Sequence, residues 1–259
     1  MRKLLAVFAV LILAASGRAK VKTQVVEYSY DGTKLKGYLA YDDAVKEKRP
    51  GVLVVHEWWG LNDYAKGRAV ALAKLGYVAF CPDMYGDGQT TEHPADATKM
   101  VGLVRKNVKV WKGRAEAGLK QLVAQPQTDS TKLAAIGYCF GGSTALQLAY
   151  SGADLKAVVT FHASLPTPTP EEAKAIKAKI IVCNGADDTF VTADSIAAFK
   201  GALKDAKVDL KFENYPGAVH SFTVKEADKK ELPGMKYNPD ADEKSWALMQ
   251  ETFKAVLGK

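Results

Sequence analysis

The feature that most constrains the fold is a regular alternation of short apolar runs with longer amphipathic segments. The runs "PGVLVVHE", "YVAFCPD" and "LKAVVTFH" are almost continuously apolar, which is typical of strands buried on both faces of a sheet. Segments with helical periodicity lie between such runs, for example "DYAKGRAVALAKLG" and "TADSIAAFKGALKDA". Strands that alternate with helices form a mostly parallel sheet covered by helices on both faces. The pattern therefore predicts an α/β fold.

The alternation continues to the end of the chain without a repeat, a low-complexity segment or a linker, so we predict one domain over residues 20–259. It opens with two strands around Asp31-Gly32, which is a hairpin signal. The helical periodicity between about Ala95 and Ala124 is expected to break near Lys109. The polar segment from Lys225 to Asn238 is expected to form a long surface loop.

Residues 1–19 differ from the rest of the chain. Arg2 and Lys3 give a basic start, and the apolar run from Leu4 to Ala15 is too short to span a bilayer comfortably. The small-x-small triplet that ends at Ala19 resembles a cleavage site. These features predict a signal peptide cleaved after Ala19, and a protein that is exported, periplasmic or secreted, without stable membrane insertion. The alternative interpretation is an uncleaved N-terminal anchor.

Charge argues against a nucleic-acid partner. The formal net charge is +7, and the loss of Arg2, Lys3 and Arg18 with the signal peptide lowers it to +4. The remaining lysines are scattered among acidic residues without a long basic block, which is typical of a solvated surface.

The three cysteines are Cys81, Cys139 and Cys183, an odd number that leaves at least one free thiol. Cys81 and Cys183 lie in apolar strand-like runs, so we expect buried core thiols, although the sequence also permits a disulfide between them.

Cys139 lies in the stretch "IGYCFGG", where a strand-like run ends in a glycine-rich turn. Gly137-Tyr138-Cys139-Phe140-Gly141 fits the nucleophile-elbow pattern of α/β-hydrolases, with cysteine in the place usually held by serine. The elbow needs small residues two positions before and after the nucleophile, because larger ones would clash with the packed strand and helix. The alternative interpretation is a buried structural cysteine beside a loop.

Two later strand ends supply the other groups that a thiol nucleophile needs. "GADDTFV" follows one strand and "YPGAVHSF" follows the next, and the carboxyl ends of parallel strands meet at one edge of a sheet. The order Cys139, then Asp187 or Asp188, then His220 is the order of nucleophile, acid and base in α/β-hydrolases. The spacing of three residues to Val191 favours Asp188 over Asp187 as the acid.

The other histidines offer alternatives to His220. His162 also ends a strand and is the reserve base, or a residue that lines the site. His56 ends another strand and is expected to pack or orient its loop, and His93 is expected to be exposed.

Taken together, the motifs resemble the dienelactone hydrolase family of α/β-hydrolases. The resemblance runs from about Gly51 to the C-terminus and rests on "VVHEWWGLN", "GYVAFCPDMYG", "GYCFGG", "GADDTFV" and "PGAVHSF", in the order and spacing of the family. It implies an α/β-hydrolase fold with a mostly parallel central sheet and helices on both faces. It also implies a catalytic triad of Cys139, His220 and Asp188.

The same resemblance implies further roles at the site. Glu57 matches a family glutamate that contacts the resting thiol, and its other interpretation is a polar loop residue bound to backbone N–H groups. The backbone N–H groups of Phe140 and Trp58 would form the oxyanion hole. The substrate pocket would include Trp59, Tyr85 and His162.

One departure from the family concerns the substrate. Dienelactone hydrolase binds its substrate carboxylate with arginines, and the matching positions here hold Asp87 in one segment and Thr223 or Val224 in the other. The hydrolytic groups are therefore expected to carry over, but the named substrate is not.

These observations predict an exported cysteine-dependent hydrolase that cleaves an ester, lactone or related acyl compound, with a small-molecule substrate as its partner and no cofactor. The sequence contains no paired His or Cys spacing typical of a metal site. Two other classes stay open, a non-catalytic binding module with the same fold and a thiol-redox protein. The absence of a C-x-x-C motif argues against dithiol exchange.

Overall fold

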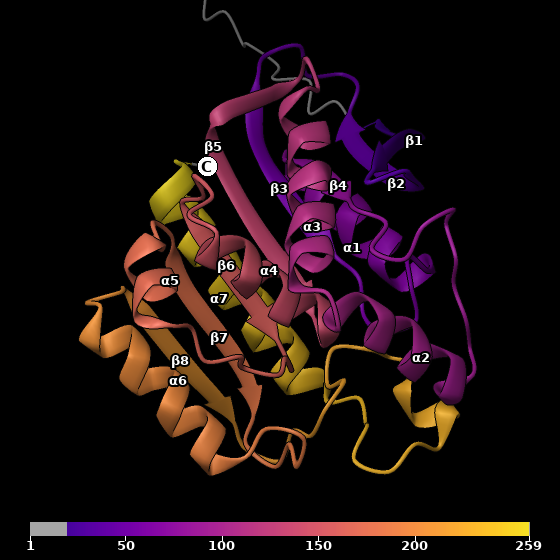
Figure 1. Cartoon of the computed structure of the whole chain (residues 1–259). Helices are drawn as coiled ribbons and strands as arrows, with labels where there is room; N and C mark the ends of the chain where they lie inside the picture. The colour runs from indigo at the N-terminus through magenta and orange to yellow at the C-terminus, as the bar shows by residue number, and fades with distance from the viewer. Residues whose placement is uncertain (1–19, 259) are drawn as a thin grey trace, which may run out of the picture.

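The structure of the protein is a computed structural model that describes residues 20–258 (Figure 1). The predicted signal peptide, residues 1–19, lies outside the described residues. In chain order the strands are β1 (Val21–Tyr30), β2 (Thr33–Asp42), β3 (Arg49–Val55), β4 (Val78–Cys81), β5 (Thr128–Tyr138), β6 (Ala157–Phe161), β7 (Lys179–Gly185) and β8 (Leu210–Tyr215). The helices are α1 (Asp63–Lys74), α2 (Pro94–Arg105), α3 (Val108–Val123), α4 (Phe140–Tyr150), α5 (Pro170–Ala175), α6 (Ala193–Asp205), the 3₁₀ helix η1 (Ala227–Lys230) and α7 (Pro239–Leu257).

The strands form one eight-stranded sheet in the order β1-β2-β4-β3-β5-β6-β7-β8. β2 pairs antiparallel with both β1 and β4, and every pair from β4 to β8 is parallel. The mostly parallel sheet predicted from the sequence is therefore confirmed. The predicted hairpin is also present, because Asp31 and Gly32 connect β1 to β2 with φ of 48° and 73°.

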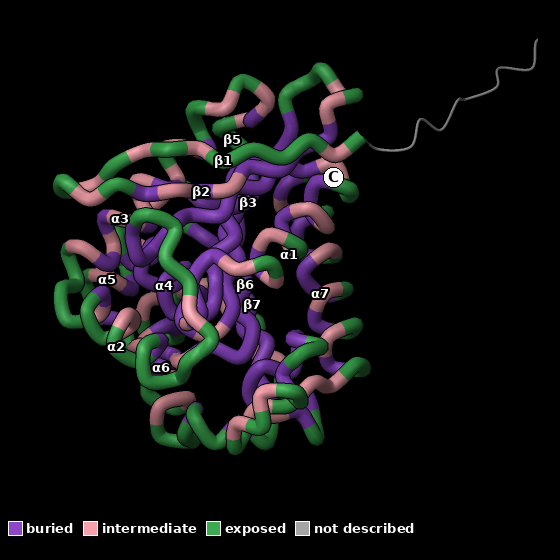
Figure 2. The backbone as a smooth tube through the Cα atoms, turned by 90° about the vertical axis from the view of Figure 1, so that its right-hand side faces the viewer, coloured by how far each residue is buried: buried purple, intermediate pink, exposed green. Residues whose placement is uncertain are grey.

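Alternate residues of each buried strand face two separate cores. On β3, Val52 and Val54 pack with residues of α1 and α7, whereas Leu53 and Val55 pack with residues of α3, α4 and α6. Figure 2 shows the buried strands between these two helical layers, with α1 and α7 on the same side. A strand buried on both faces must be apolar at every position, which explains the continuous apolar runs.

The helix boundaries follow local capping signals. The helical periodicity over 95–124 is interrupted as predicted, since it is divided between α2 and α3. The Asn107 side chain caps the start of α3 by accepting a hydrogen bond from the Val110 N–H. Helix α5 was not predicted from the sequence. Its start has a capping box in which Thr169 and Glu172 bond reciprocally to each other's backbone N–H, a signal readable from the spacing T-x-x-E.

The segment after β8 is more ordered than the predicted surface loop. It contains η1, and Val224 and Ala227 are buried. Residues on both sides of Met235 bond to the backbone of His220, since the His220 N–H donates to the Gly234 carbonyl and the Lys236 N–H donates to the His220 carbonyl. The segment thus fixes the backbone of His220 from one side.

The glycines around Cys139 are required by close packing of the backbone. A Cβ added at Gly137 would lie 2.0 Å from the Gly141 carbonyl oxygen, and one added at Gly141 would lie 2.2 Å from the Val55 carbonyl oxygen. Both distances are far below van der Waals contact, and the obstructing atoms are backbone. Glycine at 137 therefore allows α4 to lie this close to the end of β5, and glycine at 141 allows α4 to lie this close to the end of β3.

Replacing Gly141 with alanine should lower the free energy of unfolding by roughly 2–4 kcal/mol, because β3 or α4 would have to shift. The control is Gly201→Ala in α6, where an added Cβ meets nothing within 4 Å. There alanine should raise the free energy of unfolding by about 0.5–1 kcal/mol, because glycine is a poor helix former. Urea denaturation measures both, and equal stability of the two variants would contradict this account of the elbow.

Candidate active site

Four polar residues lie just beyond the carboxyl ends of neighbouring strands. Glu57 follows β3, Cys139 follows β5, Asp188 follows β7, and His220 follows β8. These strands are parallel, so the loops meet at one edge of the sheet. Topology alone thus explains how residues from distant parts of the sequence reach one site.

Cys139 occupies a strained position between β5 and α4. Its φ of 51° and ψ of −116° are unfavourable for a residue with a side chain, and its N–H donates to the Phe161 carbonyl at 3.0 Å. The residue is half-buried, so its thiol is accessible.

All three cysteines are free. The disulfide between Cys81 and Cys183 that the sequence permitted is absent, and both thiols lie in the core as expected. Burial raises the pKa of the Cys183 thiol to about 12 and that of Cys81 further still. These two thiols are therefore unreactive near neutral pH, in contrast to the accessible Cys139.

His220 is buried and bonded to one of the two candidate aspartates. Its Nδ1 lies 2.8 Å from Oδ2 of Asp188, which is itself buried and accepts a second bond from the Phe190 N–H at 2.9 Å. Asp187 is exposed and makes no contact with His220 within the described residues. The geometry thus agrees with the choice of Asp188 over Asp187.

The charge state of His220 is set by opposing effects. Burial lowers its pKa, but negative charge on Cys139 and the hydrogen bond to Asp188 raise it to about 10. The imidazolium form of His220 is therefore favoured wherever Cys139 carries a negative charge. The thiolate is the nucleophilic form of cysteine, so this pairing favours covalent chemistry at Cys139.

Two backbone N–H groups are available beside the thiol. Phe140 is the first residue of α4, so its N–H has no acceptor within the helix. In residues 20–258 the Trp58 N–H also has no acceptor. Groups of this kind can stabilise negative charge that develops on a carbonyl oxygen.

The aromatic residues predicted for the pocket lie in different environments. The Tyr85 hydroxyl donates to the Trp58 carbonyl at 2.8 Å, and its ring stacks on Phe140 with centroids 5.9 Å apart. Trp58 is half-buried, whereas Trp59 is buried, with the ammonium of Lys230 4.2 Å from its ring centroid. Trp58 is therefore the more accessible of the two tryptophans.

His162 is placed differently from the prediction that it lines the pocket. It is fully buried, with φ of 40°, and its ring packs beside His220 and against Phe222 with centroids 5.2 and 5.3 Å away. The end of β6 points the ring into the protein, so it supports the site from behind. Burial and the charge of His220 lower the pKa of His162 well below its usual value, so it is neutral.

Glu57 is buried and bonded to Ser221. The Ser221 hydroxyl donates to its Oε1 at 3.4 Å, and no hydrogen bond joins Glu57 to Cys139 among the described residues. Burial raises the pKa of Glu57 to about 7, although His220 and Ser221 act in the opposite direction. The expected contact between Glu57 and the thiol therefore stays a prediction, and the hydrogen bond seen at Glu57 is the one from Ser221.

The positions that hold arginines in the family present no cation to the site. Asp87 forms an exposed ion pair with Lys36 at 3.0 Å, and the Thr223 hydroxyl is directed into the protein. A cation does lie near the elbow, because the Arg105 guanidinium lies 5.5 Å from the ring centroid of Phe140.

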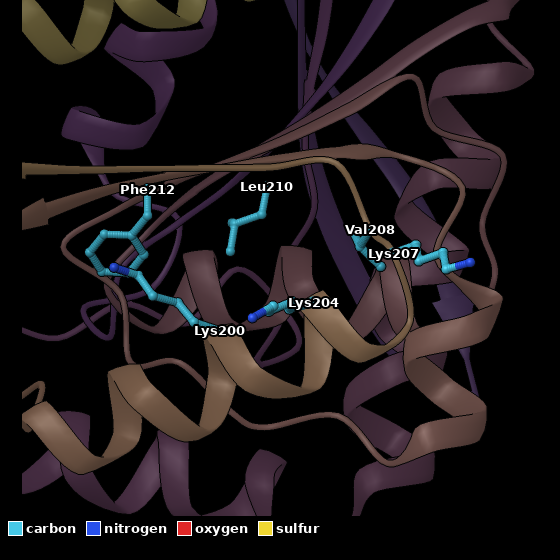
Figure 3. A pocket seen from close by; sticks show the side chains of 6 residues that line it. All are labelled: Lys200, Lys204, Lys207, Val208, Leu210 and Phe212. Carbon is cyan, nitrogen blue, oxygen red and sulfur yellow. The ribbon is translucent and has the colours of Figure 1, made fainter.

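A groove of about 1110 Å³ adjoins this site. It runs between α1 and the segment after His220, and Glu57, Trp59 and Ser221 are among its lining residues. A second hollow of about 510 Å³ lies between α6 and β8 (Figure 3), and its lining residues are Lys200, Lys204, Lys207, Val208, Leu210 and Phe212. These side chains include no cysteine, serine, histidine or carboxylate, and none of them belongs to the candidate site. No group of three or more potential metal ligands occurs in residues 20–258.

Comparisons with known proteins agree with this arrangement. Residues 35–257 match the model of the dienelactone hydrolase family. The chain belongs to the dienelactone hydrolase family.

Relatives and solved structures match the chain over nearly its whole length. The usf protein of Aquifex pyrophilus is 30% identical over 239 residues, which is 90% of this chain and 99% of that protein. An Aquifex aeolicus protein provisionally named a carboxymethylenebutenolidase matches to the same extent. Among solved structures, m3DLH is 40% identical with a TM-score of 0.89, covering 92% of this chain and 99% of its own. P91, described as a dienelactone hydrolase-like promiscuous phosphotriesterase from metagenomic libraries, is 38% identical with a TM-score of 0.89, covering 91% and 98%.

Family membership makes this chain a hydrolase of ester or lactone bonds with the α/β-hydrolase fold. No helix in residues 20–258 is long and apolar enough to cross a membrane.

The charge on Cys139 should be visible in the titration of His220 in this dienelactone hydrolase homologue. Cys139→Ser replaces the thiolate with a neutral hydroxyl, so the imidazolium loses stabilisation and the pKa of His220 should fall from about 10 by roughly one unit or more. Cys183→Ser is the control, because that thiol is in the core, and it should leave the titration unchanged. NMR of the histidine ring protons measures both, and equal pKa values in the two variants would contradict the proposed pairing.

Proposed function

We propose that the chain hydrolyses an ester, lactone or related acyl compound through a Cys139–His220–Asp188 triad. The observation that supports this most strongly is the position of His220, which bonds to Asp188 at 2.8 Å and lies close enough to Cys139 for negative charge on the sulfur to raise the pKa of the imidazole. The proposal includes export, which rests on residues 1–19 alone.

In the first half of the reaction the Cys139 thiolate attacks the carbonyl carbon of the substrate. A C–S bond forms, and the carbonyl electron pair moves onto oxygen, where the N–H groups of Phe140 and Trp58 stabilise it. Collapse of this intermediate breaks the C–O bond. The leaving oxygen takes the proton of the His220 imidazolium, and the acyl group stays on Cys139 as a thioester.

In the second half His220 is neutral and acts as a base. It takes a proton from water as the water oxygen attacks the thioester carbonyl. The second tetrahedral intermediate expels the Cys139 thiolate and releases the acid, which restores the thiolate–imidazolium pair. Throughout, Asp188 holds the Nδ1 proton of His220, so that Nε2 faces the reacting atoms.

The two other classes considered from the sequence predict different behaviour. Neither a non-catalytic binding module nor a thiol-redox protein would turn over an ester at a rate that depends on both Cys139 and Asp188. A phosphotriester belongs in the substrate panel, because P91 is described as a promiscuous phosphotriesterase.

Asp188→Asn should lower kcat for p-nitrophenyl acetate by about 10²–10⁴-fold, because an amide donates to Nδ1 and stabilises the wrong tautomer of His220. Asp187→Asn is the matched control on the neighbouring exposed residue and should stay within about twofold of wild type. Cys139→Ala gives the background rate. Turnover by Cys139→Ala at the wild-type rate, or a larger loss in Asp187→Asn than in Asp188→Asn, would refute the proposed triad.

A further inference from the structure

A line of buried polar groups runs from α1 to Glu57 behind the proposed triad. The Arg68 Nε donates to the Tyr64 hydroxyl at 3.3 Å, and that hydroxyl lies 2.6 Å from Oγ1 of Thr223. The same Oγ1 lies 2.8 Å from Nε2 of His162. On the other side of the imidazole, Nδ1 lies 4.0 Å from Oε1 of Glu57. The line therefore joins a guanidinium to a carboxylate through two hydroxyls and one neutral ring.

The Arg68 guanidinium determines which way the hydrogens point. It can only donate, and its Nη2 is held by Asp242 and by the Thr223 carbonyl, both at 2.7 Å. The Tyr64 oxygen accepts from Arg68, so the single Tyr64 hydrogen is free to donate to Thr223. The Thr223 hydrogen is then left for Nε2 of His162, which must accept it.

This arrangement fixes the tautomer of His162. A neutral imidazole that accepts at Nε2 has its proton at Nδ1, and that N–H faces the Glu57 carboxylate. Nδ1 has no hydrogen-bond partner in the described residues, and at 4.0 Å the Glu57 carboxylate faces it as an electrostatic neighbour. In the opposite arrangement His162 Nε2–H would donate to Thr223 and the Thr223 hydroxyl would donate to Tyr64. The Tyr64 hydrogen would then have no acceptor, and the lone pair of His162 Nδ1 would face the Glu57 oxygen, so this arrangement is disfavoured.

We propose that Tyr64 and Thr223 act as a relay that makes His162 a positioning residue, whose Nδ1–H faces the Glu57 carboxylate and, together with the Ser221 hydroxyl, sets its position. The inference rests on the proposed function, because it concerns a carboxylate beside the proposed nucleophile. It explains why His162 is buried with a strained φ although it lines no accessible surface. It also gives a role to Thr223, which occupies one of the positions next to the missing arginine.

The relay acts on a carboxylate that is close to its titration point. Burial raises the pKa of Glu57 to about 7, so a small change in its hydrogen bonds changes its charge at neutral pH. The titratable and charged groups that surround it are His162, His220, Arg68, Lys230, Tyr64 and Tyr85. Loss of the Nδ1–H donor removes a group that favours the anion, so the pKa of Glu57 rises. The protonated carboxyl group is then populated at higher pH and is free to approach the thiol.

The test is the pH profile of kcat/KM for p-nitrophenyl acetate. Thr223→Val keeps the size of the side chain and removes its hydroxyl. It should move the acidic limb of the profile upward by about 0.5–1 pH unit, because the carboxylate loses part of its interaction with one N–H dipole that faces it. Thr223→Ser keeps the hydroxyl and should keep the wild-type limb. Tyr64→Phe should shift the limb in the same direction as Thr223→Val, and the double variant should shift it no further than the larger single shift.

Tyr138→Phe is the matched control. The Tyr138 ring lies beneath the same guanidinium at 5.5 Å, but its buried hydroxyl has no hydrogen-bond partner, so its removal should leave the limb in place. The relay would be overturned if Thr223→Val and Tyr64→Phe both kept the acidic limb of the kcat/KM profile at its wild-type pH. It would also be overturned if these variants only lowered kcat by the same factor at every pH. Failure of the triad itself is distinguishable, because Cys139→Ala would then retain wild-type turnover whatever the profile of the relay variants.

Discussion

The structure depends most on the close packing of β5 against α4 around Cys139. Two glycines allow backbone atoms to approach where any side chain would clash, and the turn between them forces Cys139 to a positive φ. The strain is stabilised by the surrounding parallel strands, which bury apolar residues on both faces of the sheet. The result is an accessible thiol at the N-terminus of a helix, where the helix dipole and a free N–H favour negative charge.

The remaining groups reach the thiol because they follow neighbouring parallel strands. His220 is the one that connects them, since it contacts Asp188 through one side of its ring and interacts with Cys139. Its backbone is fixed by residues 234–236, and its ring packs against His162. Burial lowers the pKa of this imidazole, so its charge depends on Asp188 and on negative charge at Cys139.

Much of this arrangement could be predicted from the sequence. Continuous apolar runs predicted buried strands, and the positions just after those runs predicted where Cys139, Asp188 and His220 would meet. The sequence could not show the direction of side chains within the site. His162 ends a strand as Cys139 does, but its ring points inward, and the Glu57 carboxylate accepts a hydrogen bond from Ser221. The contact between Tyr64 and Thr223 joins residues 159 positions apart, and no local pattern marks either of them.

The most direct test of the account is the identity of the covalent intermediate. After rapid acid quenching of the enzyme during turnover of p-nitrophenyl acetate, mass spectrometry of its peptides should find one acetyl group on the peptide that contains Cys139. The adduct should disappear as the substrate is consumed, and it should be absent from the peptides that contain Cys81 and Cys183. Product formation without an adduct on Cys139, or with an adduct on another residue, would contradict the proposed nucleophile.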